Sequence, residues 1–141
     1  MDPREELCQA LKERLSNIEE IKHVDLWNSN IDFLEEEEPW QRPAVFIQFM
    51  PIKWNVMRDC FRGFGELRLH TVVDWNQDAP IAAWRLTDKI WQELTRIEGE
   101  YFSGTYPDQT IPNVDHSAVF ENIDVFQVKY IKPWIEDDED M

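Results

Sequence analysis

The sequence lacks the features that would place it in several large classes of protein. Its 141 residues include two cysteines, Cys8 and Cys60, which form no C-x-x-C pair. This usage is typical of free thiols in a reducing compartment. No apolar run approaches the roughly 20 residues that a helix needs to span a bilayer. No signal peptide is visible, so we expect a soluble protein made in the cytoplasm, with no membrane partner.

Positive charge is also scarce. Lysine and arginine total 14 against 29 aspartates and glutamates, which gives a formal net charge of −15. Because phosphate binding relies on Lys and Arg, such a chain will not hold nucleic acid through its overall surface. The surplus is partly local, in the runs Glu35–Glu38 and Glu136–Asp140. The first run predicts a solvated loop, and the second predicts a tail that is disordered unless a partner orders it.

The three histidines do not form a metal-binding pattern. His23, His70 and His116 each lie in a predicted strand, with no second histidine at i+2 or i+4. A site that joins them to Asp74 or Asp115 has no support in the spacing. Each histidine is better explained as a surface or core-edge residue, and we expect no metal and no cofactor.

Signatures of catalysis are equally weak. Ser103 lies in S-G-T rather than in a G-x-S-x-G nucleophile elbow. The G-F-G segment Gly63–Gly65 lacks the third glycine of a phosphate-binding loop and is better explained as a pair of backbone hinges. Cys60 has Arg58 and Arg62 on either side, which would favour a thiolate, but a free thiol is the simpler interpretation. We therefore assign no catalytic residue and expect that the protein is not an enzyme.

The chain contains a long β-hairpin. Pro43–Trp54 and Gly65–Trp75 are rich in β-branched and aromatic residues, and the second segment alternates cleanly between apolar and polar positions. A period of two places one set of side chains against a core and the other toward water or a partner. The segment between them, Asn55–Phe64, predicts a tip that projects beyond the sheet. Pro51 should cause an edge position or a bulge.

Two amphipathic helices accompany this hairpin. The first runs from Pro3 to about Asn17 and is capped by Asp2. The second is expected to begin with Asp78 as its N-cap and to end before Gly99, after a continuous apolar face.

The remaining segments complete an α+β fold. His23–Asn28 predicts a short strand, and Glu100–Asp115 predicts mostly loop. His116–Phe120 and Ile123–Trp134 predict two final strands separated by a turn or bulge at residues 121–122. We expect a mostly antiparallel sheet with both helices packed on one face.

We predict one α+β domain at residues 1–135, followed by the acidic tail at residues 136–141. Two surfaces in this domain are candidates for subunit contacts. The hairpin tip is basic and aromatic on an otherwise acidic chain, and two tryptophans seven residues apart form a strip beside the apolar face of the second helix. A basic tip and an acidic body suit head-to-tail association, which closes into a ring when the rotation allows. The residues concerned are Arg58, Phe61, Arg62 and Phe64 in the tip and Trp84 and Trp91 in the strip.

The order of these elements resembles a known family. The N-terminal helix, P-A-V-F-I-Q-F at Pro43–Phe49, G-E-L-R-L-H-T-V-V-D at Gly65–Asp74, the helix through Leu94 and the strand Val125–Ile131 are similar to tail terminator and tail-completion proteins of long-tailed bacteriophages and prophages. The resemblance covers roughly residues 4–134 and depends on element order and strand texture rather than on a diagnostic motif. Seven tryptophans and the acidic tail depart from the family pattern.

The resemblance implies a virion structural protein in the tail or neck, made in the host cytoplasm. It implies a ring, typically a hexamer, that ends the tail tube and offers a surface to the head connector. DNA would pass through the lumen without sequence-specific binding. The charge also allows an alternative, a small acidic inhibitor or immunity protein that mimics nucleic acid and binds a basic partner.

Overall fold

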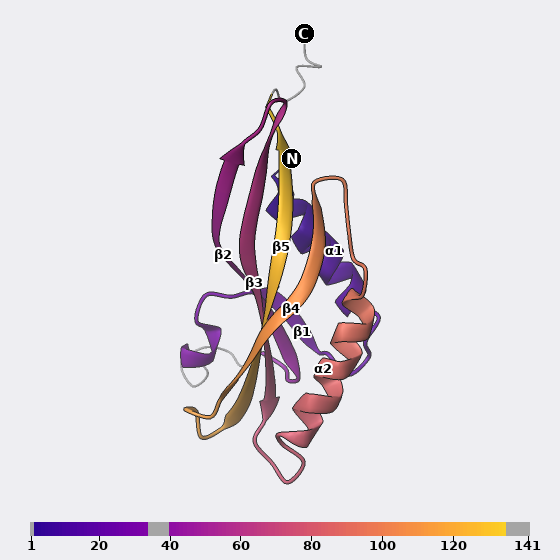
Figure 1. Cartoon of the computed structure of the whole chain (residues 1–141). Helices are drawn as coiled ribbons and strands as arrows, with labels where there is room; N and C mark the ends of the chain where they lie inside the picture. The colour runs from indigo at the N-terminus through magenta and orange to yellow at the C-terminus, as the bar shows by residue number, and fades with distance from the viewer. Residues whose placement is uncertain (1, 34–39, 135–141) are drawn as a thin grey trace.

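The computed structural model of the chain describes residues 2–33 and 40–134. Two helices and a five-stranded sheet make up the fold, with β1 parallel to β2 and every other pair antiparallel (Figure 1). The predicted α+β class is therefore confirmed. Glu35–Glu38 and Glu136–Asp140 lie outside the described residues. The elements in chain order are α1 (Pro3–Leu15), β1 (His23–Leu26), a 3₁₀ helix (Asn30–Phe33), β2 (Ala44–Val56), β3 (Cys60–Asp74), α2 (Ile81–Leu94), β4 (Phe102–Asn113) and β5 (Val119–Pro133).

Helix α1 forms where the sequence predicts it and ends two residues earlier, at Leu15. The Asp2 side chain caps it by accepting a hydrogen bond from the Arg4 N–H at 2.8 Å. The Arg4 side chain also bonds this carboxylate, which lowers the pKa of Asp2 to about 2. Local signals are sufficient here because the cap and the first turn are adjacent in the sequence.

Both helices pack on one face of the sheet, as predicted, and share a single apolar core with it. The strand order is β1-β2-β3-β5-β4, so β3 and β5 lie in the middle of the sheet. The buried members of this core from the helices and the central strands are Leu7, Leu11, Leu15, Ala83, Leu86, Ile90, Leu94, Val45, Ile47, Leu67, Leu69, Phe126, Val128 and Tyr130.

The predicted ends of α2 were wrong at both termini. The helix begins after Pro80, and no side chain caps it, so Asp78 is not the N-cap. It stops at Leu94, and Arg96 takes the positive φ of 61° that Gly99 was expected to provide. A residue other than glycine can adopt this conformation at a helix end when the surrounding packing favours it.

The predicted projecting tip Asn55–Phe64 was also wrong. β2 and β3 remain paired as far as Val56 and Phe61, and only three residues, numbers 57–59, connect them. Gly63 and Gly65 are not hinges, because they lie inside β3. A Cβ on Gly63 would come within 2.8 Å of the Trp54 ring, so the glycine leaves space for that side chain.

The predicted irregularity at Pro51 is confirmed. The register between β2 and β3 shifts between Phe49 and Ile52, as expected for a bulge at a residue that cannot donate to the ladder. A Cβ on Gly65 would lie 3.1 Å from the Pro51 carbonyl oxygen, so the bulge also depends on a glycine in the facing strand.

Segment Glu100–Asp115 is not mostly loop, because it contains β4. This strand pairs only with β5 and forms an edge of the sheet. An edge strand tolerates proline, because a residue whose nitrogen faces away from the neighbouring strand does not need an N–H to donate to the ladder. Pro107 and Pro112 both lie within it, and two register shifts accommodate the irregular part.

The two final strands are a single strand, β5. Glu121 and Asn122, which were predicted to form a turn or bulge, lie in the interior of β5 and are buried. Polar side chains in a row are typical of a turn, but here neighbouring strands provide partners for the Glu121 carboxylate, as described below.

The second face of the sheet is partly covered. The segment that leads from β1 to β2 brings Trp27 and Trp40 against a small apolar cluster that includes Phe46 and Val72. Phe46 is fully buried, and its ring lies 4.8 Å from that of Trp40 in an edge-to-face arrangement. We call the side of the sheet away from the helices the open face, because the rest of it lacks such a cover within the described residues.

Tyr130 gives the fold a pH-sensitive element. Its side chain is 1% exposed, and no hydrogen-bond partner for its hydroxyl is present in the described part of the chain. Burial raises the pKa of Tyr130 from 10.0 to about 12. The folded protein keeps this proton while the unfolded chain releases it, so the free energy of unfolding should fall by about 2–3 kcal/mol as the pH rises from 10 to 12.

Tyr130→Phe should remove this part of the pH dependence. At neutral pH the variant should be as stable as the wild type or more stable, because the hydroxyl it loses is buried and unpaired. Urea unfolding at a series of pH values measures both effects. Tyr106→Phe, at an exposed tyrosine, is the matched control and should follow the wild-type curve. An unchanged slope in Tyr130→Phe above pH 10 would contradict the assignment.

Candidate interaction surfaces

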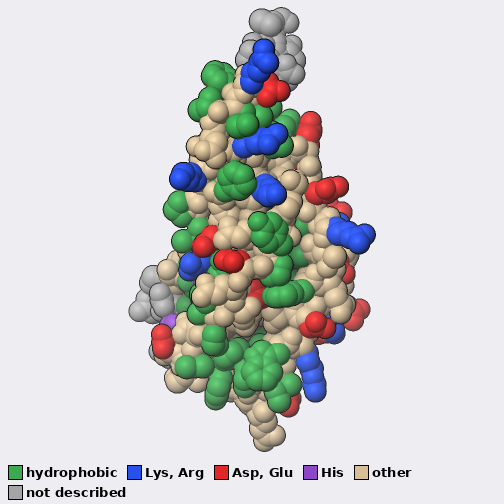
Figure 2. All heavy atoms as spheres, in the orientation of Figure 1, with side chains coloured by type: hydrophobic (Ala, Val, Ile, Leu, Met, Phe, Trp, Pro, Cys, Tyr) green, Lys and Arg blue, Asp and Glu red, His purple; other side chains and the backbone are tan. Residues whose placement is uncertain are grey.

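The far ends of β2, β3 and β5 form a three-stranded extension that we call the arm, residues 51–66 and 127–134. Figure 1 shows it reaching past the N-terminus of α1. The ladder between β3 and β5 continues to the pair Cys60 and Pro133. The arm contains five lysines and arginines and two carboxylates, so it is basic on an acidic chain. In Figure 2, Lys and Arg side chains alternate with hydrophobic ones over this part of the molecule.

One face of the arm continues the helix side of the sheet and is aromatic. The alternation places Trp54, Val56 and Phe61 on this side. Phe61 stacks on Trp134 with ring centroids 5.1 Å apart. Val56 is 67% exposed, and Trp54 and Trp134 are exposed as well. The two helices cover this side of the sheet outside the arm but leave these side chains exposed. The arm therefore presents an apolar surface to a partner.

The opposite face of the arm belongs to the open face and is basic. Lys53, Phe64 and Lys129 form one row across β2, β3 and β5, and Arg62 and Ile131 are paired two residues nearer the turn. A hollow of about 240 Å³ lies here, with Arg62, Phe64, Lys129 and Ile131 among its lining residues.

The turn at the end of the arm is held by Trp134. Its indole N–H donates to the Met57 carbonyl oxygen at 2.9 Å. Arg58 is exposed at this turn and forms no ion pair with any described residue. The four predicted tip residues therefore lie in three different places. Arg58 lies in the turn, Phe61 lies on the helix side, and Arg62 and Phe64 lie on the open face.

The predicted tryptophan strip lies on the outer side of α2. Trp84 is 57% exposed. The Trp91 indole N–H donates to Asp124 Oδ2 at 3.0 Å, and its ring meets Phe126 edge to face. Trp91 is thus partly fixed against β5, whereas Trp84 remains available to a partner.

A hollow of about 260 Å³ separates this strip from β4 and β5, and we call it the tryptophan groove. Trp84 and Trp91 line one side. Asp124, which is buried, lines the other and accepts a hydrogen bond from the Thr110 hydroxyl at 2.7 Å. The amide nitrogen of Asn122 is buried there with no partner in the described chain. The groove therefore offers aromatic surface, negative charge and one unused hydrogen-bond donor.

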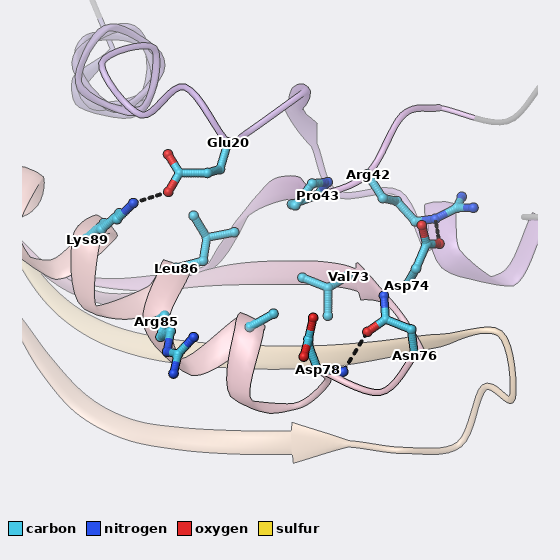
Figure 3. A pocket seen from close by; sticks show the side chains of 11 residues that line it. Glu20, Arg42, Pro43, Val73, Asp74, Asn76, Asp78, Arg85, Leu86 and Lys89 are labelled. Carbon is cyan, nitrogen blue, oxygen red and sulfur yellow. Dashed lines mark hydrogen bonds and ion pairs between the residues drawn. The ribbon is translucent and has the colours of Figure 1, made fainter.

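A larger cleft of about 430 Å³ lies beside the first turns of α2 (Figure 3). Arg42 pairs with Asp74, and Lys89 pairs with Glu20, so four of the charged groups that line the cleft form two separate ion pairs. Arg85 and Asp78 also line it, and we assign the cleft no function.

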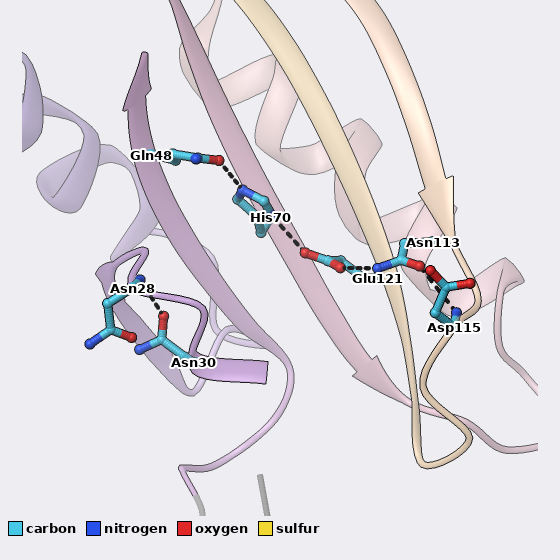
Figure 4. Close-up of polar contacts among 7 residues, drawn as sticks. All are labelled: Asn28, Asn30, Gln48, His70, Asn113, Asp115 and Glu121. Atoms are coloured by element: carbon cyan, nitrogen blue, oxygen red, sulfur yellow. Dashed lines mark hydrogen bonds and ion pairs between the residues drawn. The ribbon is translucent and has the colours of Figure 1, made fainter. Parts of the chain in front are cut away.

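A polar ladder crosses four strands of the open face (Figure 4). His70 Nδ1 lies 2.5 Å from Glu121 Oε2, and His70 Nε2 lies 2.7 Å from Gln48 Oε1. The Asn113 amide donates to Glu121 Oε1 at 2.7 Å. Trp27 stacks on the His70 ring with centroids 3.8 Å apart. Sequence reasoning missed this ladder. The sequence carried one indication of it: residues 119, 121 and 123 fall on the same face of the sheet if a single strand runs through all three.

The described residues offer few groups for metal binding or thiol chemistry. Among residues 2–33 and 40–134, no group of three or more His, Cys, Asp and Glu side chains is arranged to hold a metal ion. Cys8 and Cys60 are free and half-buried, and burial raises the pKa of the Cys8 thiol. Neither described helix is long and apolar enough to cross a membrane.

Comparison with known proteins gives a likeness of fold. No protein-family model and no curated protein matches the sequence. Among solved structures, a chain from the virion of a native gene transfer agent (GTA) particle matches with a TM-score of 0.58 at 10% sequence identity. The match covers 89% of this chain and 94% of the other, so nearly the whole of each takes part in the shared fold.

Proposed function

We propose that this chain is a virion structural protein, a ring-forming tail terminator or tail-completion subunit of a phage-like particle. The observation that carries the proposal is the near full-length likeness in fold to a chain of a gene transfer agent virion. The order of helices and strands that resembles tail terminators supports the same role. Fold alone does not determine function, so the proposal also depends on the two surfaces described above.

In this role the protein acts by shape and association, without catalysis. A ring, typically a hexamer, would cap the tail tube in the neck of the virion and present a surface to the head connector. DNA would pass through its lumen without sequence-specific binding. Assembly would take place in the host cytoplasm.

The ring contact that we propose joins the arm of one subunit to the tryptophan groove of the next. These surfaces lie on different parts of the molecule, as a head-to-tail contact requires. Their charges are complementary, since the arm carries Arg58 and Arg62 and the groove carries Asp88 and Asp124. The exposed ring of Trp84 offers a face on which a guanidinium binds well.

Arg58→Glu combined with Arg62→Glu should weaken ring formation and leave the monomer folded. Reversing two interface charges places like charges together, and we expect the protein concentration at half-assembly to rise by about tenfold or more. Native mass spectrometry over a concentration series measures this shift, and circular dichroism checks the fold.

The matched control is Lys12→Glu combined with Lys22→Glu, which changes the net charge equally at exposed positions outside the arm. This variant should assemble as the wild type does. If the arm variant also assembles normally, the arm is not a subunit interface. If the wild type forms no ring even with a tail-tube protein present, the proposed function itself fails.

The alternative, an acidic inhibitor that mimics nucleic acid, makes a different prediction. It requires a monomer or dimer that binds a basic protein with strong salt dependence. The net charge of −15 favours it, whereas the basic arm has no role in such a mimic. The native mass separates the two functions.

A further inference from the structure

The side chain of Asn122 lines the tryptophan groove and is not satisfied by its own chain. Asn122 is 3% exposed, and its amide nitrogen has no hydrogen-bond partner among the described residues. It lines the hollow of about 260 Å³ together with Trp84 and Asp124. Because a buried donor without an acceptor costs free energy, a ligand that brings an acceptor into the groove gains from it.

Neighbouring polar groups do not relieve this donor. Thr71 faces Asn122 across β3 and β5, and its buried hydroxyl has no described partner either. The two oxygens of the nearby Asp124 carboxylate already accept hydrogen bonds from the Trp91 indole and the Thr110 hydroxyl. The described chain therefore supplies no acceptor, and the groove is open to one from another molecule.

The rest of the groove selects the molecule that carries this acceptor. Asp88 and Asp124 make the groove negative, and the exposed ring of Trp84 offers a face to a planar cation. A guanidinium has this planar shape, and an ammonium does not. A main-chain peptide group carries an acceptor and a donor, so it matches both ends of the Asn122 amide. The groove therefore fits an arginine residue through its side chain and its main chain together.

The turn of the arm presents both groups at one residue. Arg58 is exposed and forms no ion pair with any described residue. The carbonyl oxygens of Met57 and Asp59 accept hydrogen bonds from Trp134, whereas no described residue bonds the carbonyl oxygen of Arg58. Arg62 differs, because it lies in β3 between two paired strands, where the ladder uses its main-chain groups.

We propose that the tryptophan groove is a site for an arginine residue, and that Asn122 determines its specificity by donating a hydrogen bond to the main-chain carbonyl oxygen of that residue. In the ring, Arg58 of the neighbouring subunit occupies the site, so the identity of the occupant rests on the proposed function. Its guanidinium lies on the Trp84 ring, beside the two carboxylates of the groove. The free subunit thus carries an unpaired donor that assembly satisfies.

Asn122→Leu separates this role from a structural one. Leucine is similar in size and removes the unpaired donor, so the urea concentration at the midpoint of unfolding should be unchanged or higher in the unassembled chain. The protein concentration at half-assembly should nevertheless rise about tenfold, as measured by native mass spectrometry. A lower urea midpoint, or assembly equal to that of the wild type, would overturn the assignment of Asn122.

Thr71→Val is the matched control. It removes another buried polar group that lacks a described partner, on the strand beside Asn122, but Thr71 does not line the groove. This variant should unfold at the same or a higher urea concentration and should assemble as the wild type does. Assembly as weak as that of Asn122→Leu would mean that the loss comes from the packing of the sheet, which would overturn the proposal.

A double-mutant cycle identifies the occupant. Arg58→Gln and Asn122→Leu should each weaken assembly, and the combined variant should lose less than the product of the two effects, because both changes remove one shared contact. Arg62→Gln combined with Asn122→Leu should show the full product of its single effects. Coupling of Asn122 to Arg62 rather than to Arg58 would overturn the assignment of Arg58.

Binding of N-acetyl-arginine N-methylamide tests the site without rings. In the full chain with Arg58→Glu and Arg62→Glu, which leaves the groove empty, this probe should shift the NMR signals of the Asn122 side-chain amide and the Trp84 indole. The citrulline analogue, which has no charge, should require a concentration about tenfold higher.

The probe also separates the two proposals. An unshifted Asn122 amide would overturn the arginine site, whether or not the wild type forms rings. A wild type that forms no ring while the probe shifts Asn122 would contradict the proposed function and support the arginine site.

Discussion

Glu121→Ala is expected to lower the free energy of unfolding by about 3–5 kcal/mol, the cost of removing one partner from a buried pair. Glu121 is 2% exposed, and both of its oxygens accept hydrogen bonds within the polar ladder. The change leaves His70 without its carboxylate and the Asn113 amide without its acceptor. Chemical denaturation followed by circular dichroism measures the loss.

Two further variants test the reason for this loss. Glu121→Gln keeps the size and an acceptor for Asn113, so it should cost less, about 1–3 kcal/mol. Asp74→Asn removes a carboxylate from the more exposed pair with Arg42 and should cost at most about 1 kcal/mol. A cost for Glu121→Ala as small as that for Asp74→Asn would show that the ladder does not stabilise the fold.

Phe46→Ala should be comparably damaging, at about 3–5 kcal/mol, because it empties the centre of the small core on the open face. The Phe46 ring is fully buried and meets those of Trp27 and Trp40 edge to face. Its loss also loosens Trp27, which stacks on His70. The urea concentration at the midpoint of unfolding should fall. The backbone amides of the strands that carry the polar ladder should exchange their hydrogens faster.

Phe64→Ala is the matched control, because Phe64 lies on the same face of the sheet but is largely exposed. We expect a change within about 0.5 kcal/mol, as is usual for surface positions. Similar costs for the two phenylalanines would mean that the segment bearing Trp27 and Trp40 does not form a core over β2.

The sequence predicted best those features that neighbouring residues determine. The cap of α1 needs only Asp2 and Arg4, and Pro51 alone was enough to predict the bulge in β2. The sharing of one sheet face by α1 and α2 followed from their apolar stripes, since each stripe needs a core.

Long-range partners explain the main errors. Pro107 and Pro112 indicated a loop, and only the position of β4 at the sheet edge makes a strand possible there. Glu121 indicated a turn, and the histidine that permits its burial lies 51 positions away in the sequence. Local patterns carry no information about either circumstance.

For the candidate surfaces, the sequence identified the residue types but not their arrangement. It marked Arg58, Arg62 and Phe61 as unusual on an acidic chain, yet a continuous ladder presents Phe61 and Arg62, and only Arg58 lies in a turn. The role of these residues, and of Trp84 and Trp91, in subunit contacts stays a prediction.

The uninterrupted register of β3 and β5 has a mechanical consequence. The two strands pair residue by residue from Cys60 to Asp74, without a bulge, over a length of about 50 Å. A ladder without a bulge has no local break in its pairing at which one end could shift relative to the other. Groups attached near Cys60 and near Asp74 are therefore held at a nearly constant separation.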